Sequence, residues 1–142
     1  MVVDASLAAK WLVRKVHSDN AYALARSWAR AEEYPMAPYF MPVEVANALY
    51  RRVTRKEISL QEATSLLGGL LSTGIESREP PSVHVKAIEL AAELKQDAVY
   101  DAHYLAFMEA LNSELWTADE RFYRAASSGH TQVRWIGSFS DG

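Results

Sequence analysis

Four acidic residues spread along the 142-residue chain could together perform metal-dependent chemistry. Asp4 and Asp119 each follow a short apolar run and precede a predicted helix, so both are expected at the carboxyl edge of a sheet. Glu44 lies near the start of another predicted helix, and Asp101 lies in a segment that is apolar on nearly every side. Because an unpaired carboxylate in such a segment is costly, Asp101 indicates a bound metal or a buried partner.

Taken singly, most of these acids are more typical of a helix cap or a solvated helix face than of a functional site. Taken together at one sheet edge, their oxygens would bind Mg²⁺ or Mn²⁺, and their mutual repulsion would make a cation necessary. Such a cation polarises a phosphoryl oxygen and activates a bound water for phosphodiester hydrolysis. The expected metal ligands are Asp4 and Asp101. Asp119 and Glu44 would hold a second ion, position the water or accept its proton.

Short apolar strands alternate with helical patterns along the whole chain. Ser59 and Glu62 form a capping box, Pro42 suits the first turn of a helix, and Ser82 and Asp97 are the expected caps of two further helices. This alternation predicts one domain over residues 1–142, a three-layer α/β/α sandwich with a mostly parallel, short-stranded sheet. Strands are predicted at 1–3, 36–38, 75–77, 115–116 and 133–136, and helices at 7–14, 21–32, 42–56, 60–72, 83–95, 98–111 and 117–126.

The composition excludes several other kinds of protein. The chain has no cysteine, which excludes disulfides, zinc–thiolate sites and cysteine nucleophiles. Its histidines lack the spacing of zinc ligands, and it has no glycine-rich phosphate loop. A net charge of −3 argues against a broad basic surface for nucleic acid, although a bound cation would reverse the local charge. With no apolar run of membrane-spanning length and no signal peptide, a cytoplasmic protein without membrane contact is expected.

Basic side chains near the acids are candidates for contact with an RNA backbone. One side of the helix predicted at 42–56 carries Glu44 and Asn47, followed by two arginines, opposite its apolar face. Positive charges in such positions contact phosphates, although a solvated surface is the more common role of these residue types. The candidates are Arg51, Arg55, Lys10 and Arg14.

Four segments resemble the motifs of the PIN-domain superfamily and, within it, the VapC-type toxins of prokaryotic toxin–antitoxin pairs. They occur in the family's order and at family-like spacing over essentially the whole chain. Each motif is short, and the specificity comes from finding all of them in order. The segments are VVDAS at 2–6, PVEVANAL at 42–49, YDAHYLA at 100–106 and LWTADERF at 115–122.

The resemblance implies an endoribonuclease that uses Mg²⁺ or Mn²⁺ to cleave RNA, acting as the toxin of a type II toxin–antitoxin system. It also implies a homodimer and a small antitoxin protein whose tail enters the acidic groove. The family's four acids match Asp4, Glu44, Asp101 and Asp119, and its supporting polar positions match Ser6, Asn47 and Thr117.

Two other functions remain compatible with the sequence. In a phosphoaspartate, receiver-like domain Asp4 would be a nucleophile, but neither Lys10 nor Lys95 is well placed to assist it. A non-catalytic interaction module would bind a protein partner through apolar helices, for example the leucine-rich segment 61–71. Four clustered carboxylates make pure scaffolding the weaker hypothesis, because they cost stability unless they bind something.

Overall fold

The computed structural model describes residues 1–141 and contains a five-stranded sheet in which every neighbouring pair of strands is parallel. The strand order is β3-β2-β1-β4-β5, which places β1 (Val2–Val3) at the centre. The other strands are β2 (Met36–Pro38), β3 (Glu76–Arg78), β4 (Leu115–Thr117) and β5 (Val133–Trp135). The helices are α1 (Ala5–Leu12), α2 (Ser18–Arg30), α3 (Met41–Thr54), α4 (Leu60–Leu71), α5 (Ser82–Glu93), α6 (Tyr100–Ala110) and α7 (Glu120–Ser127), with a 3₁₀ turn at Ile136–Ser138.

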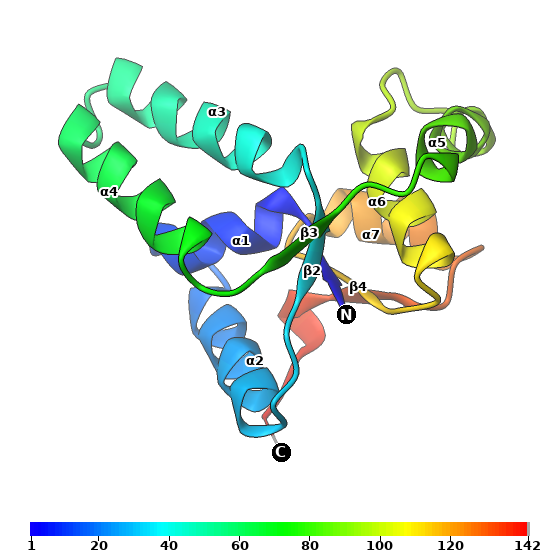
Figure 1. The fold of residues 1–142 in the computed structure, drawn as a ribbon, viewed down its shortest axis with the longest axis horizontal. Helices are drawn as coiled ribbons and strands as arrows, with labels where there is room; N and C mark the ends of the chain where they lie inside the picture. Colours follow the sequence, from blue (N-terminus) through cyan, green and yellow to red (C-terminus); the bar gives the residue numbers. More distant parts are fainter. Residues whose placement is uncertain (142) are drawn as a thin grey trace.

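Helices cover both faces of the sheet, which confirms the predicted α/β/α sandwich (Figure 1). Between β1 and β3 the chain carries α1 to α4 on one face, and between β3 and β5 it carries α5 to α7 on the other. α6 packs across β1, β2 and β4, and α7 packs against β4 and β5. The strand order reverses at β1 and β4, and ligands of open α/β sheets bind outside the carboxyl ends of such strands.

The core is built around the two central strands and helix α6. Val2, Val3 and Leu115 have no exposed surface, as expected for strands covered on both faces. In α6 every residue from Tyr104 to Met108 is buried, which confirms the prediction of a helix surrounded by the core. Among the described residues, no helix is both long enough and apolar enough to cross a membrane.

Two predicted helix caps are wrong. α5 begins at Ser82 itself, and Pro81 occupies the capping position, where its missing N–H leaves no donor unpaired. α6 begins only at Tyr100, because Asp97 lies in the connection that follows the left-handed turn at Lys95 (φ +54°). Neither helix start has a side-chain cap.

The element that carries Thr117 also differs from the prediction. Thr117 is the last residue of β4 and pairs with Trp135 of β5, whereas the sequence pattern placed it at the start of a helix. The pairing of β4 with β5 extends it by one residue beyond the apolar run. As a result, the Thr117 side chain belongs to the sheet edge beside Asp4 rather than to α7.

We expect Ser59→Ala to lower the free energy of unfolding by about 1 kcal/mol, because it removes the cap of α4. The predicted capping box is confirmed: Ser59 Oγ accepts from the Glu62 backbone N–H at 3.0 Å, and the Glu62 carboxylate accepts from the Ser59 N–H at 3.3 Å. Urea unfolding measures the loss. Gln61→Ala, an exposed change in the same turn, is the control, and equal stability of the two variants would contradict the prediction.

Candidate active site

Asp4 is held at the carboxyl end of β1 by three donors. It is the N-cap of α1, and its Oδ1 accepts from the Leu7 backbone N–H at 2.9 Å and from Ser6 Oγ at 2.7 Å. Its Oδ2 accepts a short hydrogen bond from Thr117 Oγ1. The residue is only 4% exposed, so the carboxylate is fixed in one orientation. One lone pair of Oδ2 has no donor among residues 1–141.

The hydroxyls of Ser6 and Thr117 join β1 to the turn after β4. Each hydroxyl donates its single proton to Asp4, so the 3.2 Å contact between them is a close approach rather than a further donation. Each also accepts a backbone N–H, Ser6 Oγ from Ala118 and Thr117 Oγ1 from Asp119, both at 3.0 Å. The two hydroxyls therefore set the position of Asp119 relative to Asp4.

Asp119 begins α7 as its N-cap, and its Oδ1 accepts from the Phe122 backbone N–H at 3.0 Å. Its side chain is exposed, in contrast to that of Asp4. Asp4 and Asp119 therefore both cap helices, as expected for such acids taken singly. Each carboxylate also lies at the sheet edge.

Tyr104 connects Glu44 to the start of α1, a role that was not expected from the sequence. Its hydroxyl donates to Glu44 Oε1 at 2.8 Å and accepts from the Ala5 backbone N–H at 3.2 Å. Since Tyr104 is almost completely buried, this hydroxyl fixes the glutamate of α3 against the first turn of α1. The available signal was its spacing, three residues after Asp101 on the same side of a helix.

The four acids Asp4, Glu44, Asp101 and Asp119, which we call the acid cluster, influence one another electrostatically. Burial and, to a smaller extent, the charges of Asp119 and Glu44 together raise the pKa of Asp101 to about 6. Burial also raises the pKa of Asp4 to about 6, against its three hydrogen bonds, and raises the pKa of Glu44 against its bond from Tyr104. At neutral pH the cluster therefore carries unfavourable negative charge that a cation would relieve.

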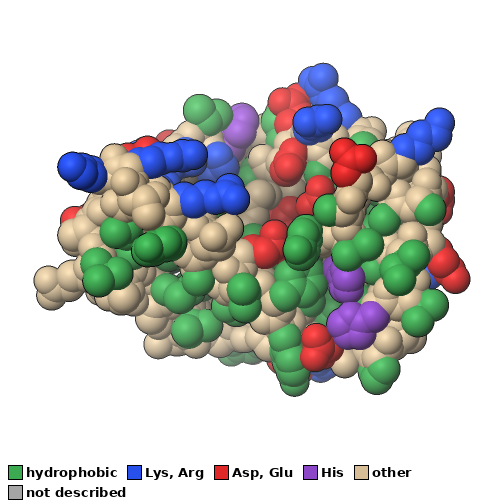
Figure 2. Space-filling view, turned by 90° about the horizontal axis from the view of Figure 1, so that it is seen from above, with side chains coloured by type: hydrophobic (Ala, Val, Ile, Leu, Met, Phe, Trp, Pro, Cys, Tyr) green, Lys and Arg blue, Asp and Glu red, His purple; other side chains and the backbone are tan. Residues whose placement is uncertain are grey.

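Three members of the acid cluster line one cavity of about 530 Å³, namely Glu44, Asp101 and Asp119. Asp4 is buried and does not line it. Figure 2 shows carboxylates around a central hollow, with Lys and Arg side chains on both sides of it. Over residues 1–141, no three carboxylate or imidazole side chains are arranged to hold one metal ion. The donor set itself consists of hard oxygen ligands, which suits Mg²⁺ or Mn²⁺.

The predicted basic contacts fall into two groups. Arg51 and Asn47 line a second cavity of about 700 Å³ together with Glu44 and Ser6. Lys10, Arg14 and Arg55 line neither cavity, and Arg14 pairs instead with Asp19 at 2.8 Å on the surface.

Two cations that sequence reasoning did not select, Lys95 and Arg121, line the acidic cavity. Arg121 had a signal, since it lies two residues after Asp119. No sequence signal indicated Lys95, because its position beside the cavity depends on the turn that follows α5.

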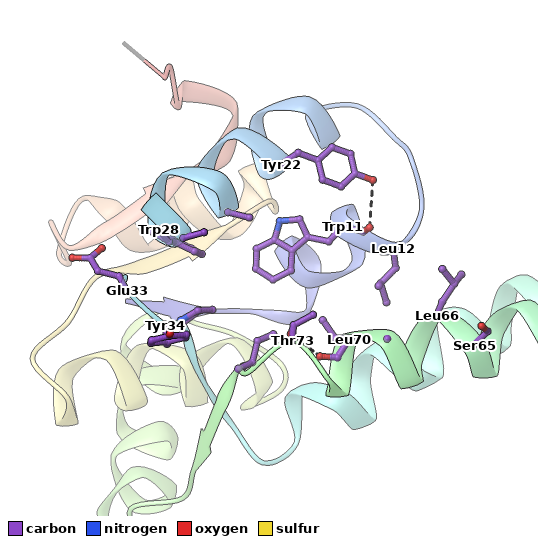
Figure 3. A pocket seen from close by; sticks show the side chains of 15 residues that line it. Trp11, Leu12, Tyr22, Trp28, Glu33, Tyr34, Ser65, Leu66, Leu70 and Thr73 are labelled. Carbon is purple, nitrogen blue, oxygen red and sulfur yellow. Dashed lines mark hydrogen bonds between the residues drawn. The ribbon is translucent and has the colours of Figure 1, made fainter. Parts of the chain in front are cut away.

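An apolar cavity of about 480 Å³ lies apart from the acid cluster, between α1, α2 and α4 (Figure 3). Trp11 and Trp28 meet edge to face across it, and Trp11 donates its indole N–H to the Ala21 carbonyl at 2.9 Å. The leucine-rich segment 61–71 contributes Leu66 and Leu70 to its wall. No member of the acid cluster lines this cavity, so it is suited to an apolar partner and not to hydrolysis.

Known proteins resemble this chain in sequence and in fold. The PIN domain family matches residues 1–127. Two proteins named Ribonuclease VapC1, from two strains of Mycobacterium tuberculosis, are 34% identical over 125 residues, which cover 87% of this chain and 89% of theirs.

Two solved structures share the fold at lower sequence identity. The structure of PAE2754 from Pyrobaculum aerophilum has a TM-score of 0.70 at 20% identity and covers 96% of this chain and 90% of its own. Mycobacterium tuberculosis VapC20, described as a sarcin–ricin loop cleaving toxin, has a TM-score of 0.67 at 19% identity, with 88% and 94% covered. At these identities the likeness shows the fold alone.

We expect Tyr104→Phe to raise the pKa of Glu44 further, because the lost hydroxyl bond lowers that pKa in the native protein. The change also leaves the Ala5 N–H without its partner and should cost about 1–2 kcal/mol of stability. Carboxyl-detected NMR titration measures the pKa. Tyr22→Phe is the control, since it removes a hydroxyl bond to Trp11 outside the acid cluster. A Glu44 pKa that moves in neither variant would contradict the positioning role.

We expect metal-free Asp101→Asn to be more stable than the native protein at pH 7.5, by about 1 kcal/mol after allowance for partial exposure. The native pKa of about 6 lies above the ordinary 3.8, so the folded state binds the proton more tightly than the unfolded state. The stabilisation from this group is present below pH 4 and is lost as the pH rises through 6. Thermal unfolding in EDTA from pH 4 to 8 measures it, with Glu32→Gln as the exposed-acid control. Parallel pH profiles for Asp101→Asn and the native protein would refute the prediction.

Proposed function

This chain belongs to the PIN domain family, and within it to the VapC-type ribonucleases; on that premise we propose that it cleaves RNA at the acid cluster. The observation that carries the assignment is that Glu44, Asp101 and Asp119, which come from separate elements, line one cavity at the sheet edge near the buried Asp4. The charges of Asp119 and Glu44 contribute to the raised pKa of Asp101 there. A cavity with such a charge distribution repels a free phosphodiester. It therefore fits a reaction in which a divalent cation accompanies the substrate.

We propose Mg²⁺ or Mn²⁺ as the cofactor, with Asp4 and Asp101 as its main ligands. When bound, such an ion neutralises charge on the phosphate and lowers the pKa of water. The chain's own contribution is orientation: Ser6 and Thr117 fix the carboxylate of Asp4, and Tyr104 fixes that of Glu44. Asp119 is exposed and only its Oδ1 accepts the helix-cap hydrogen bond, so its other oxygen is suited to accept a proton from the attacking water.

A phosphoaspartate enzyme is the weaker alternative because of the environment of Asp4. A nucleophilic carboxylate must be reachable by a phosphoryl donor, whereas Asp4 is buried and both of its oxygens accept hydrogen bonds. Lys95 lines the neighbouring cavity, but Asp4 does not. The geometry thus supports a structural role for Asp4, with one lone pair of Oδ2 left for a metal ion.

We propose that the protein is the toxin of a type II toxin–antitoxin pair and acts on RNA in the cytoplasm. The apolar cavity between α1, α2 and α4 supports a partner that inserts apolar side chains, as an antitoxin segment would. A homodimer is supported by Val85 and Ile88, which are exposed three residues apart on α5. Its interface would then be distinct from both cavities.

We expect the native protein to cleave a mixed pool of single-stranded RNA in Mg²⁺ or Mn²⁺ and not in EDTA. Asp101→Asn and Asp4→Asn should each lower the rate at least ~100-fold, because each removes a carboxylate that the reaction needs. Gel analysis of end-labelled RNA measures cleavage, and Glu32→Gln should retain the native rate. Full activity in both Asn variants would exclude the acid cluster as the site. Cleavage unaffected by EDTA would exclude the metal.

A further inference from the structure

Tyr100 has an unusual position for an aromatic residue that no hydrogen bond or ring contact holds within the described part of the chain. It is the first residue of α6 and precedes Asp101, yet it is 61% exposed. The other tyrosine of α6, Tyr104, lies one turn later on the buried side of the helix. Covering such an exposed aromatic ring lowers the free energy, because it removes apolar surface from water.

The two cavities at the sheet edge meet at Tyr100. The acidic cavity of about 530 Å³ and the second cavity of about 700 Å³ have only Glu44 and Tyr100 in common among their lining residues. The two cavities are therefore halves of one path over the sheet edge. At its midpoint a carboxylate of the acid cluster lies beside an exposed ring.

Within residues 1–141, each half of this path is lined by cations that form no ion pair. Arg51 lines one half, and Lys95 and Arg121 line the other. All three are exposed, and none of them forms an ion pair with a carboxylate in residues 1–141. Unpaired cations on either side of an acidic, cation-requiring centre are positioned for phosphates that precede and follow the scissile one.

We infer that Tyr100 is a stacking platform for an unpaired base of the RNA strand next to the cleaved phosphate, and that the strand runs from Arg51 over Tyr100 to Lys95 and Arg121. The inference rests on the proposed function. Stacking on a ring tolerates any base, since every base has a flat aromatic face, but the base must be unpaired. Tyr100 thereby selects single-stranded RNA, including loops, over duplex RNA.

The test measures binding, separately from cleavage, on the full chain with Ca²⁺ in place of Mg²⁺. The probe is a single-stranded RNA decamer that carries the fluorescent base 2-aminopurine at one position, which is moved along a series of oligomers. The native protein should quench the fluorescence at one position as that base stacks. Tyr100→Phe should keep the quenching and the affinity, whereas Tyr100→Ala should lose the quenching and weaken binding about 5- to 100-fold.

Two controls separate stacking from other roles of the ring. Tyr50→Ala removes a tyrosine of equal exposure, 60%, that lines neither cavity, and it should bind as the native protein does. Duplex RNA should bind more weakly than the single strand and with the same affinity to Tyr100→Ala as to the native protein. Tyr100→Leu serves if the alanine variant does not fold, because it keeps apolar bulk without a ring.

Several outcomes would overturn the inference. Native affinity and quenching in Tyr100→Ala would exclude stacking, even if Asp101→Asn still abolishes cleavage and the nuclease assignment stands. An equal loss of duplex binding would show that the ring does not act on an unpaired base. Conversely, binding with quenching but no cleavage in Mg²⁺ or Mn²⁺ would support the platform and contradict the proposed reaction. Failure of the native protein to bind any oligomer would contradict both.

Discussion

The buried carboxylate of Asp4 is the constraint on which the site depends. A carboxylate with 4% exposure is stable only where donors surround it, and here the donors come from the first turn of α1 and from β4. Those hydrogen bonds join the two central strands at their carboxyl ends and place the start of α1 and the start of α7 side by side. The remaining acids are positioned around this pair of helix starts.

Helix α6 supplies the second fixed support. Because the helix is buried on nearly every side, its rotation about its own axis is set by core packing, and this packing determines where Asp101 and Tyr104 face. The Tyr104 hydroxyl transmits that rigidity to Glu44 on the opposite helical layer and to the Ala5 N–H. Helices α1, α3 and α6 are thus held in one arrangement at the sheet edge by hydrogen bonds to a single hydroxyl.

The same arrangement stores electrostatic repulsion. Burial raises the pKa of Asp4, Asp101 and Glu44, and neighbouring carboxylates contribute to the rise for Asp4 and Asp101. Without a metal ion, the site therefore favours the protonated form of these acids. A cation bound at such a site would relieve this repulsion and so stabilise the folded protein. The apolar cavity between α1, α2 and α4 lies apart from the acid cluster, so a protein partner there would leave the charge balance of the site unchanged.

The sequence by itself determined the alternation of strands and helices, the buried character of α6 and the four acids, since periodicity and strand ends are local properties. It also indicated that Asp4 and Asp119 cap helices, because a cap bonds within three residues. Only the tertiary structure decided the bond from Thr117 to Asp4, 113 residues apart, and that from Tyr104 to Glu44, 60 residues apart. It likewise selected Lys95, Arg121 and Arg51 over Lys10 and Arg14 as cavity-lining cations, because which surface charges face a cavity depends on how the helices pack and where the turns between them lie.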